Sequence, residues 1–389
     1  MPEDRADIPG GQETRAQETG AQVAGAQPAA GASGPAHPPL AIRTNPQLAA
    51  GRHAATVCAI AHDEMYFLPA FLAHYRRLGA DRFVILDDRS TDGTAEYLAG
   101  EPDVMVVESP LRYFEEVAYA PEERAGILET RAVRLWRDQM MNGFCEGQWT
   151  VMADPDELLV LPGGLTLPAF AARLEAEGAA AVWGAMIDMY PRAIGDITGP
   201  RAAPTGPGGF DPGGPGGASA AGSGAGPWLF DARPHIDPGQ PIQSPAIPRT
   251  VYPGSVARLF ARWGVLGQGT LVRRIRRRLS GYRYEGASMI HKTPFLRWQA
   301  GDRFLNCHVT SKPVSATRAV AILHFKFTAD LGRKIEYALK SGGYNQGSRS
   351  YRLYATLIDR MMQADAAFTA GISREYTSWK DLEESGILR

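Results

Sequence analysis

Two groups of closely spaced carboxylates are the residues of this 389-residue chain best suited to chemistry. The first is Asp154-Pro155-Asp156-Glu157, directly after the apolar run 149–153, and the second is Asp87-Asp88, directly after the apolar run 82–86. Carboxylates two residues apart can turn toward one hard cation, and Mg²⁺ and Mn²⁺ prefer oxygen ligands while leaving positions for phosphates. Either group could instead only cap a helix or stabilise a turn.

The order of the predicted elements places both groups at one edge of a sheet. Apolar runs at 56–61, 82–86, 104–108 and 149–153 alternate with helical patterns, of which the one at 67–78 is the most regular. This alternation predicts an α/β fold with a Rossmann-like, mostly parallel sheet and helices on both faces. Ligands of such sheets bind beyond the carboxyl ends of the strands, where both carboxylate groups fall.

Two segments contain too few large apolar residues to bury a core. Residues 1–52 predict a disordered N-terminal tail, and residues 198–227 predict a Gly/Pro-rich flexible insertion. The remainder, residues 53–197 and 228–389, has an ordinary globular composition. The chain has 41 basic and 42 acidic residues, and a net charge of −1 argues against a nucleic-acid partner.

The compartment can also be predicted from composition. Three widely spaced cysteines form no CxxC pair, no run of 18 apolar residues occurs, and the N-terminus lacks the apolar stretch of a secretory signal. We therefore expect a cytoplasmic protein. Five arginines lie within Arg273–Arg278. We expect this segment to be a solvated surface or to contact an anionic membrane peripherally, rather than to bind an anionic acceptor.

The motifs together resemble glycosyltransferase family 2, whose members have the GT-A fold. Ala59–Glu64, Asp87–Thr94 and Asp154–Glu157 occur in the order and at the distances typical of that family. The segment 63–79 is similar to the branch that opens NE-x-x-x-L-x-E-[WF]-x-x-H-x-x-x-G, with Asp63 where Asn is usual. The resemblance covers residues 55–160 well and extends loosely to about 355. It implies a nucleotide-sugar donor and a divalent metal, Mn²⁺ or Mg²⁺.

The resemblance also implies roles for individual residues. The nucleoside would be held by the segment Ala61 to Glu64, which includes His62, and by Asp87 or Asp88. Asp154 and Asp156 would bind the metal across the diphosphate, and Glu157 would orient the metal shell or meet the donor sugar.

The C-terminal half supplies further candidates by the same resemblance. His324, in the apolar run 321–327, would complete the metal shell, with His308 as the competing candidate and a core histidine bonded to a carbonyl as the alternative. Lys292 would reach a phosphate, unless it is a solvated lysine before a turn. Inverting members need a general base, and the usual "E-D" signature is missing. Asp188 at the end of an apolar strand is the preferred candidate, although it could pair with an arginine such as Arg192, and Glu285 is the second.

The function expected from this resemblance is metal-dependent, inverting transfer of a sugar from a nucleotide-sugar donor, of UDP type, to a glycan or lipid-linked acceptor. The pathway implied is bacterial cell-surface polysaccharide synthesis. Residues 53–197 would form the nucleotide-sugar-binding half, and residues 228–389 the acceptor-side half with C-terminal helices. Two alternatives are a catalytically inactive glycan- or nucleotide-binding protein of the same fold and a Mg²⁺-dependent nucleotidyltransferase. The intact D-x-D argues against the first, and the lack of a Gly-rich phosphate loop argues against the second.

Overall fold

The computed structural model describes residues 37–198, 227–233, 254–265 and 290–389. Its strands are β1 (Ala41–Ile42), β2 (Thr56–Ala61), β3 (Arg82–Asp87), β4 (Val104–Glu108), β5 (Trp149–Met152), β6 (Glu157–Val160), β7 (Ala181–Asp188), β8 (Leu229–Asp231), β9 (His291–Arg297), β10 (Ala319–His324) and β11 (Ser373–Glu375). Its α-helices are α1 (Leu68–Arg77), α2 (Thr94–Ala99), α3 (Pro121–Arg124), α4 (Ala132–Phe144), α5 (Leu167–Ala176), α6 (Gly254–Arg262), α8 (Leu331–Ser341), α9 (Asn345–Gln363) and α10 (Trp379–Glu384). Short 3₁₀ helices are η1 (Pro46–Ala49), η2 (Pro162–Gly164) and η3 (Ile194–Asp196).

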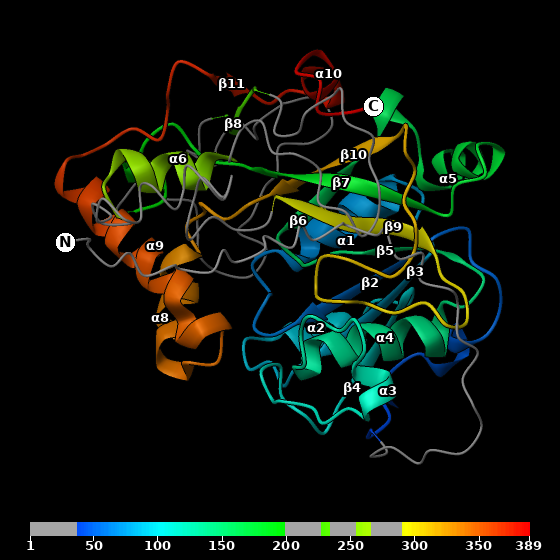
Figure 1. Cartoon of the computed structure of the whole chain (residues 1–389). Coiled ribbons are helices and arrows are strands. Elements are labelled where there is room, and N and C mark those ends of the chain that lie inside the picture. Colours follow the sequence, from blue (N-terminus) through cyan, green and yellow to red (C-terminus); the bar gives the residue numbers. More distant parts are fainter. Residues whose placement is uncertain (1–36, 199–226, 234–253, 266–289) are drawn as a thin grey trace, which may run out of the picture. The chain divides into compact units, whose positions relative to one another are not determined.

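Nine strands form one sheet in the order β1-β4-β3-β2-β5-β9-β7-β10-β6, while β8 and β11 pair separately (Figure 1). The strands β4, β3, β2, β5, β7 and β10 point in one direction, and β1, β9 and β6 run against them. The predicted α/β fold with a mostly parallel sheet is therefore confirmed. Of the three antiparallel strands, β1 falls in the predicted tail, β6 directly follows Asp156, and β9 lies in the C-terminal half, where the sequence pattern was weakest.

Helices cover both faces of the sheet, as predicted. Alternate residues of β2 enter two different cores, because successive side chains of a strand point to opposite faces. Val57 packs in the core formed with α1 and α5, whereas Cys58 packs in the core formed with α4. A third cluster joins α6 and α9 and contains Phe260 and Leu357.

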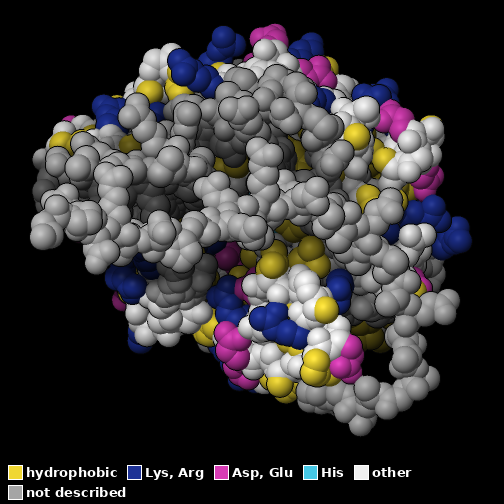
Figure 2. Space-filling view, in the orientation of Figure 1, with side chains coloured by type: hydrophobic (Ala, Val, Ile, Leu, Met, Phe, Trp, Pro, Cys, Tyr) yellow, Lys and Arg dark blue, Asp and Glu magenta, His cyan; other side chains and the backbone are white. Residues whose placement is uncertain are grey.

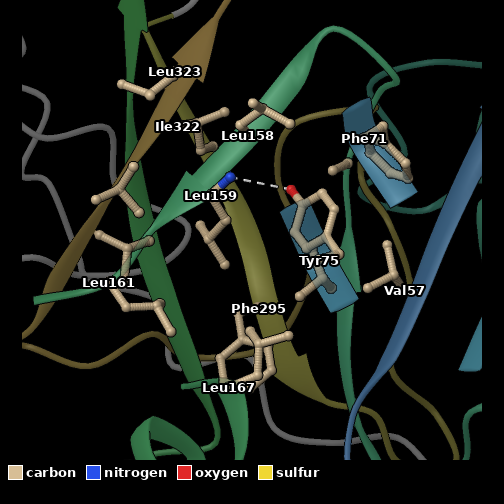
Figure 3. Packing of buried hydrophobic residues seen from close by; sticks show 14 of the residues in the cluster. Val57, Phe71, Tyr75, Leu158, Leu159, Leu161, Leu167, Phe295, Ile322 and Leu323 are labelled. Atoms are coloured by element: carbon tan, nitrogen blue, oxygen red, sulfur yellow. Dashed lines mark hydrogen bonds between the residues drawn. The ribbon is translucent and has the colours of Figure 1, made fainter. Parts of the chain in front are cut away.

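Strand β6 was not predicted, and it matters because it begins at Glu157. Tyr75 of α1 holds it in place: its hydroxyl donates to the Glu157 carbonyl at 3.1 Å and accepts from the Leu159 N–H at 3.2 Å. Figure 3 shows this ring reaching from α1 toward β6. Glu157 thus belongs to an ordered strand rather than to the loop that the sequence suggested.

The predicted tail extends too far into the fold. Residues Ala41–Ile42 pair with β4, so the sheet begins before residue 52. The buried Arg82 also donates to the carbonyls of Leu48 and Phe144, at 2.9 and 2.6 Å. Residues outside the described part of the chain include 1–36 of that tail, most of the 198–227 insertion, Glu285 and Arg273–Arg278.

The surface seen in Figure 2 carries basic and acidic side chains interspersed among the described residues. Within the described ranges, no helix combines the length and the apolar character needed to cross a bilayer.

Candidate functional site

The first part of the site is a pair of loops where β2 and β3 end. Asp63 and Arg89 both have positive φ, 53° and 57°. Asn and Asp adopt this left-handed conformation more readily than other non-glycine residues. The backbone at position 63 therefore favours Asp or Asn over most other residues.

Hydroxyl side chains of the second loop hold the first loop in position. Ser90 Oγ accepts from the Asp63 N–H at 2.9 Å, and Thr94 Oγ1 accepts from the Glu64 N–H at 3.0 Å. Asp92 Oδ1 accepts from the N–H of Thr94, the first residue of α2, at 3.0 Å. These hydrogen bonds give part of the Asp87–Thr94 motif a structural role.

The two carboxylates at the end of β3 are buried, with 5% of Asp87 and 3% of Asp88 exposed. Burial raises the pKa of Asp88, although the nearby Arg112 opposes the shift. Asp88 Oδ1 lies 3.3 Å from Arg112 Nε. Asp87 Oδ2 accepts from the Ser90 N–H at 3.2 Å, but its Oδ1 has no hydrogen-bond partner among the described residues. Asp87 therefore keeps one buried acceptor without a donor in the described part of the chain.

His62 and Glu64 face the same region from the end of β2. His62 Nδ1 donates to the Asp88 carbonyl at 2.8 Å, and its ring lies 4.7 Å from the ring of Tyr337 on α8. Glu64 Oε1 lies 3.0 Å from Lys334 Nζ, while its Oε2 is buried and has no hydrogen-bond partner in the described part of the chain. Burial raises the pKa of Glu64 to about 7, and Lys334 opposes the shift.

The second part of the site is a group that could hold a metal ion. Asp156, Glu157 and His324 each offer a ligand atom within 4.8 Å of the other two, and all three residues are buried. The sheet brings them together because β6 pairs with β10 in the register that places Glu157 opposite His324. Asp156 Oδ2 lies 4.0 Å from His324 Nε2. The mixture of carboxylate and imidazole donors suits Mn²⁺ or Mg²⁺, and the imidazole favours the transition metal.

The sequence suggested Asp154 with Asp156 and His324, and the structure groups these residues differently. Asp154 Oδ1 accepts from Arg137 Nη2 at 2.7 Å, and its Oδ2 lies 2.7 Å from Lys292 Nζ. Burial would raise the pKa of Asp154, but Lys292 and Arg137 outweigh it and hold that pKa well below its usual range. Asp154 thus lies beside the metal-capable group and is engaged by two cations.

Lys292 is buried between two carboxylates of the acidic motif. It is 3% exposed in its side chain and lies 2.6 Å from Glu157 Oε1 as well as beside Asp154. Burial would lower the pKa of Lys292, but these two carboxylates raise it above the usual value. In the structure Lys292 is a buried counter-ion of the acidic motif.

Two other lysines surround Asp156. Lys334 Nζ lies 3.4 Å from Asp156 Oδ2, and it connects this residue to Glu64. Lys326 follows the end of β10, with its Nζ 5.4 Å from the centre of the Tyr351 ring. Burial raises the pKa of Asp156, but Lys334 and His324 reverse the effect and bring it to about 2. Neither lysine was predicted, although Lys326 could have been noticed two residues after His324.

Asp188 contacts His324 and α6, whereas His308 lies apart from the metal-capable group. Among the described residues no arginine pairs with Asp188: its Oδ1 accepts from His324 Nδ1 at 3.1 Å, and its Oδ2 accepts from the Val256 N–H at 3.2 Å. His308 donates from Nδ1 to the His291 carbonyl at 2.9 Å and is not in the metal-capable group. Burial lowers the pKa of His308 to about 3, which favours the neutral ring.

Comparison with known proteins gives little beyond this geometry. No family model matches the chain, and no curated protein matches it. Among solved structures it is similar to the mannosyltransferase PcManGT from Pyrobaculum calidifontis in complex with GDP-Man and Mn²⁺, with a TM-score of 0.23 and 19% identity. That match covers 34% of this chain and 36% of the other, about a third of its length. A TM-score of 0.23 does not establish a common fold.

Proposed function

We propose that this protein transfers a sugar from a nucleotide-sugar donor with the help of a divalent metal. One observation carries the proposal: Lys334 Nζ lies 3.0 Å from Glu64 and 3.4 Å from Asp156. A single side chain therefore joins the loop after β2 to the metal-capable group after β5. A nucleoside diphosphate needs the same arrangement, with a nucleoside site and a metal site one diphosphate apart.

The nucleoside end of the donor would be held at the loops after β2 and β3. Glu64 Oε2 and Asp87 Oδ1 are buried acceptors with no hydrogen-bond partner among the described residues. Ribose hydroxyls or a base N–H would satisfy them, and buried acceptors are costly when left without a donor. His62 and Tyr337 provide ring faces beside this region.

The diphosphate end would lie at the metal-capable group. Asp156, Glu157 and His324 would hold Mn²⁺ or Mg²⁺, which supplies Lewis-acid stabilisation of the charge on a departing diphosphate. Lys326 and Lys334 replace Lys292 as the cations that we propose for the phosphates. Burial opposes the charge on Lys334, but Asp156 and Glu64 hold its pKa well above the usual value, so it stays cationic.

The charges of the site suggest that metal and diphosphate bind together. Carboxylates of this region are matched by cationic side chains, as in the pairs of Lys292 with Glu157 and of Lys334 with Glu64. A divalent cation alone would leave excess positive charge in a buried site, and a diphosphate alone would leave excess negative charge. Metal affinity should therefore rise strongly when the nucleotide is present.

The finer parts of the function remain proposals. We propose a UDP-type donor, a glycan or lipid-linked acceptor, inversion at the anomeric centre, and peripheral membrane contact through Arg273–Arg278. Because both oxygens of Asp188 accept hydrogen bonds from the protein, Asp188 is poorly placed to receive a proton from the acceptor. Glu285 is therefore the general base that we now propose.

Calorimetric titration tests the donor site. UDP, GDP and CDP are each titrated with Mn²⁺ and with EDTA into the wild type and into Asp156→Asn. Asp359→Asn, at an exposed position of α9, is the matched control. We expect one nucleotide to bind with Mn²⁺, to bind far more weakly in EDTA, and to lose the metal dependence only in Asp156→Asn. Failure of the folded wild type to bind any of the three with either metal condition would contradict the proposal.

Turnover is measured separately as metal-dependent hydrolysis of the matching nucleotide sugar. Hydrolysis that disappears in Asp156→Asn would support a transferase. Tight nucleotide binding without any hydrolysis would favour the alternative of an inactive nucleotide-binding protein.

A further inference from the structure

The Asp188 carboxylate lies between His324 and helix α6, and the metal-capable group uses only the far side of His324. Asp188 Oδ1 accepts from His324 Nδ1 at 3.1 Å, and His324 Nε2 faces Asp156 Oδ2 at 4.0 Å. We propose that Asp188 is a positioning residue, which keeps the proton of His324 on Nδ1 so that Nε2 is free to bind a metal. This inference rests on the metal site of the proposed function.

The sheet fixes the geometry of this pair. Strands β7 and β10 are parallel neighbours, and their register places His324 directly opposite Asp188. Both residues are buried, with 7% of His324 and 8% of Asp188 exposed. A neutral imidazole carries one N–H, and a carboxylate can only accept hydrogen bonds. As long as Asp188 is ionised and in place, Nδ1 must donate to it and Nε2 presents a lone pair.

Helix α6 holds Asp188 from the other side. The Val256 N–H donates to Asp188 Oδ2 at 3.2 Å, so the carboxylate cannot rotate without losing a buried hydrogen bond. Helix α6 is itself anchored by Arg258, whose Nε and Nη2 donate to the buried Asp231 at 2.8 and 3.0 Å. Asp188 is thus oriented by backbone on one side and orients His324 on the other.

This arrangement makes an unusual prediction for Asp188→Asn. The Val256 N–H needs an acceptor, so the asparagine oxygen should face α6 and its NH₂ group should face His324. His324 Nδ1 must then accept, which moves the ring proton to Nε2 and blocks the metal position. In Asp188→Ala no side chain at position 188 fixes the tautomer of His324, so both tautomers can be populated. Asparagine should therefore weaken metal binding more than alanine does, although it preserves more hydrogen bonds.

The test measures Mn²⁺ binding without nucleotide turnover. Titration followed by calorimetry and by the EPR signal of free Mn²⁺, at a fixed concentration of the nucleotide that binds, gives the affinity of each variant. We expect Asp188→Asn to weaken Mn²⁺ binding by about 10- to 100-fold and Asp188→Ala by less, consistent with the effect of outer partners of metal-bound histidines. In pulsed EPR, a ¹⁴N coupling to Mn²⁺ should be present in the wild type and lost in Asp188→Asn and His324→Gln.

A double variant shows whether Asp188 acts through His324. In the His324→Gln background, Asp188→Asn should cause no further loss of Mn²⁺ affinity. A purely structural role would instead lower the stability of both Asp188 variants, with alanine worse than asparagine, and would leave the order of Mn²⁺ affinities unrelated to the tautomer. Affinity and ¹⁴N coupling of Asp188→Asn within twofold of the wild type would overturn the inference.

One measurement needs no Asp188 variant and covers the case in which these variants do not fold. Long-range ¹H–¹⁵N NMR spectra of the metal-free wild type report the tautomer of each histidine, with His324 assigned by its loss in His324→Gln. We expect the Nδ1–H form, and the Nε2–H form would overturn the inference. If the wild type binds no Mn²⁺ or shows no ¹⁴N coupling, the metal site of the proposed function fails instead, so the two failures are distinguishable.

Discussion

Replacement of Lys292 by methionine separates two roles for this lysine. The sequence suggested a ligand of the donor phosphate, whereas the structure places Lys292 Nζ 2.6 Å from Glu157 and 2.7 Å from Asp154. Methionine preserves most of the buried volume and removes the charge. If Lys292 is a structural counter-ion, Lys292→Met should destabilise the protein even when no ligand is present.

The size of the effect follows from the burial of the pair. Removal of one partner of a buried ion pair costs about 3–5 kcal/mol, because an uncompensated charge remains. Glu157 is 2% exposed in its side chain and bears most of this penalty, while Asp154 is 37% exposed and retains Arg137. We therefore expect the lower end, about 3 kcal/mol. An unfolding entropy of about 2.1 cal/mol/K per residue over roughly 300 folded residues converts this to a fall in Tm of about 5 °C.

The assay is thermal unfolding followed by circular dichroism in EDTA and in saturating Mn²⁺. Lys340→Met, at an exposed position on α8, is the matched control and should unfold like the wild type. Mn²⁺ should raise the Tm of Lys292→Met more than that of the wild type, because a cation at Glu157 replaces the missing ammonium group.

Two results would refute this reasoning. In one, Lys292→Met unfolds at the wild-type temperature in EDTA but binds the nucleoside diphosphate at least tenfold more weakly, which returns Lys292 to the phosphate role. In the other, the variant is destabilised and Mn²⁺ gives no extra stabilisation, which would exclude Glu157 from the metal shell.

Three further predictions concern other parts of the chain. Burial lowers the pKa of His74 from 6.5 to about 4, so the stability that its neutral ring contributes is present above pH 6.5 and is lost as the pH falls toward 4. The free energy of unfolding, measured with urea, should therefore fall by about 2 kcal/mol less between pH 7 and pH 5 in His74→Gln than in the wild type. An equal fall in both proteins would contradict this prediction. A Cβ at Gly343 would overlap the Phe114 ring, so Gly343→Ala should cost about 1–3 kcal/mol of stability, and much less in a Phe114→Ala background. Equal costs in both backgrounds would exclude this contact. Lys334→Met should weaken nucleoside diphosphate binding in Mn²⁺ by about tenfold in calorimetry, and an unchanged affinity would remove Lys334 from the donor site.

The sequence by itself determined the first half of the sheet and the edge where the acidic motifs meet. The runs at 56–61, 82–86 and 104–108 are almost entirely apolar because parallel strands are buried on both faces, and that pattern is local. The carboxyl ends of such strands share an edge, so the proximity of Asp87–Asp88 to the Asp154–Glu157 segment follows from strand order alone. The parallel strands of the first half and the helices between them were therefore predictable without knowledge of any tertiary contact.

Only the tertiary structure decided which charged groups pair at that edge. Lys292 and Glu157 are separated by 135 residues, and His324 and Asp188 by 136, so no local pattern connects them. Their contacts depend on the register of β6, β7, β9 and β10, which includes antiparallel strands that the sequence pattern did not reveal. A one-residue change of register would turn each of these side chains to the opposite face of the sheet. For this reason residue type could suggest which side chains are able to bind a metal or a ligand. Strand pairing alone determined that Glu157 joins the metal-capable group, that Lys292 pairs with Glu157, and that Asp188 contacts His324.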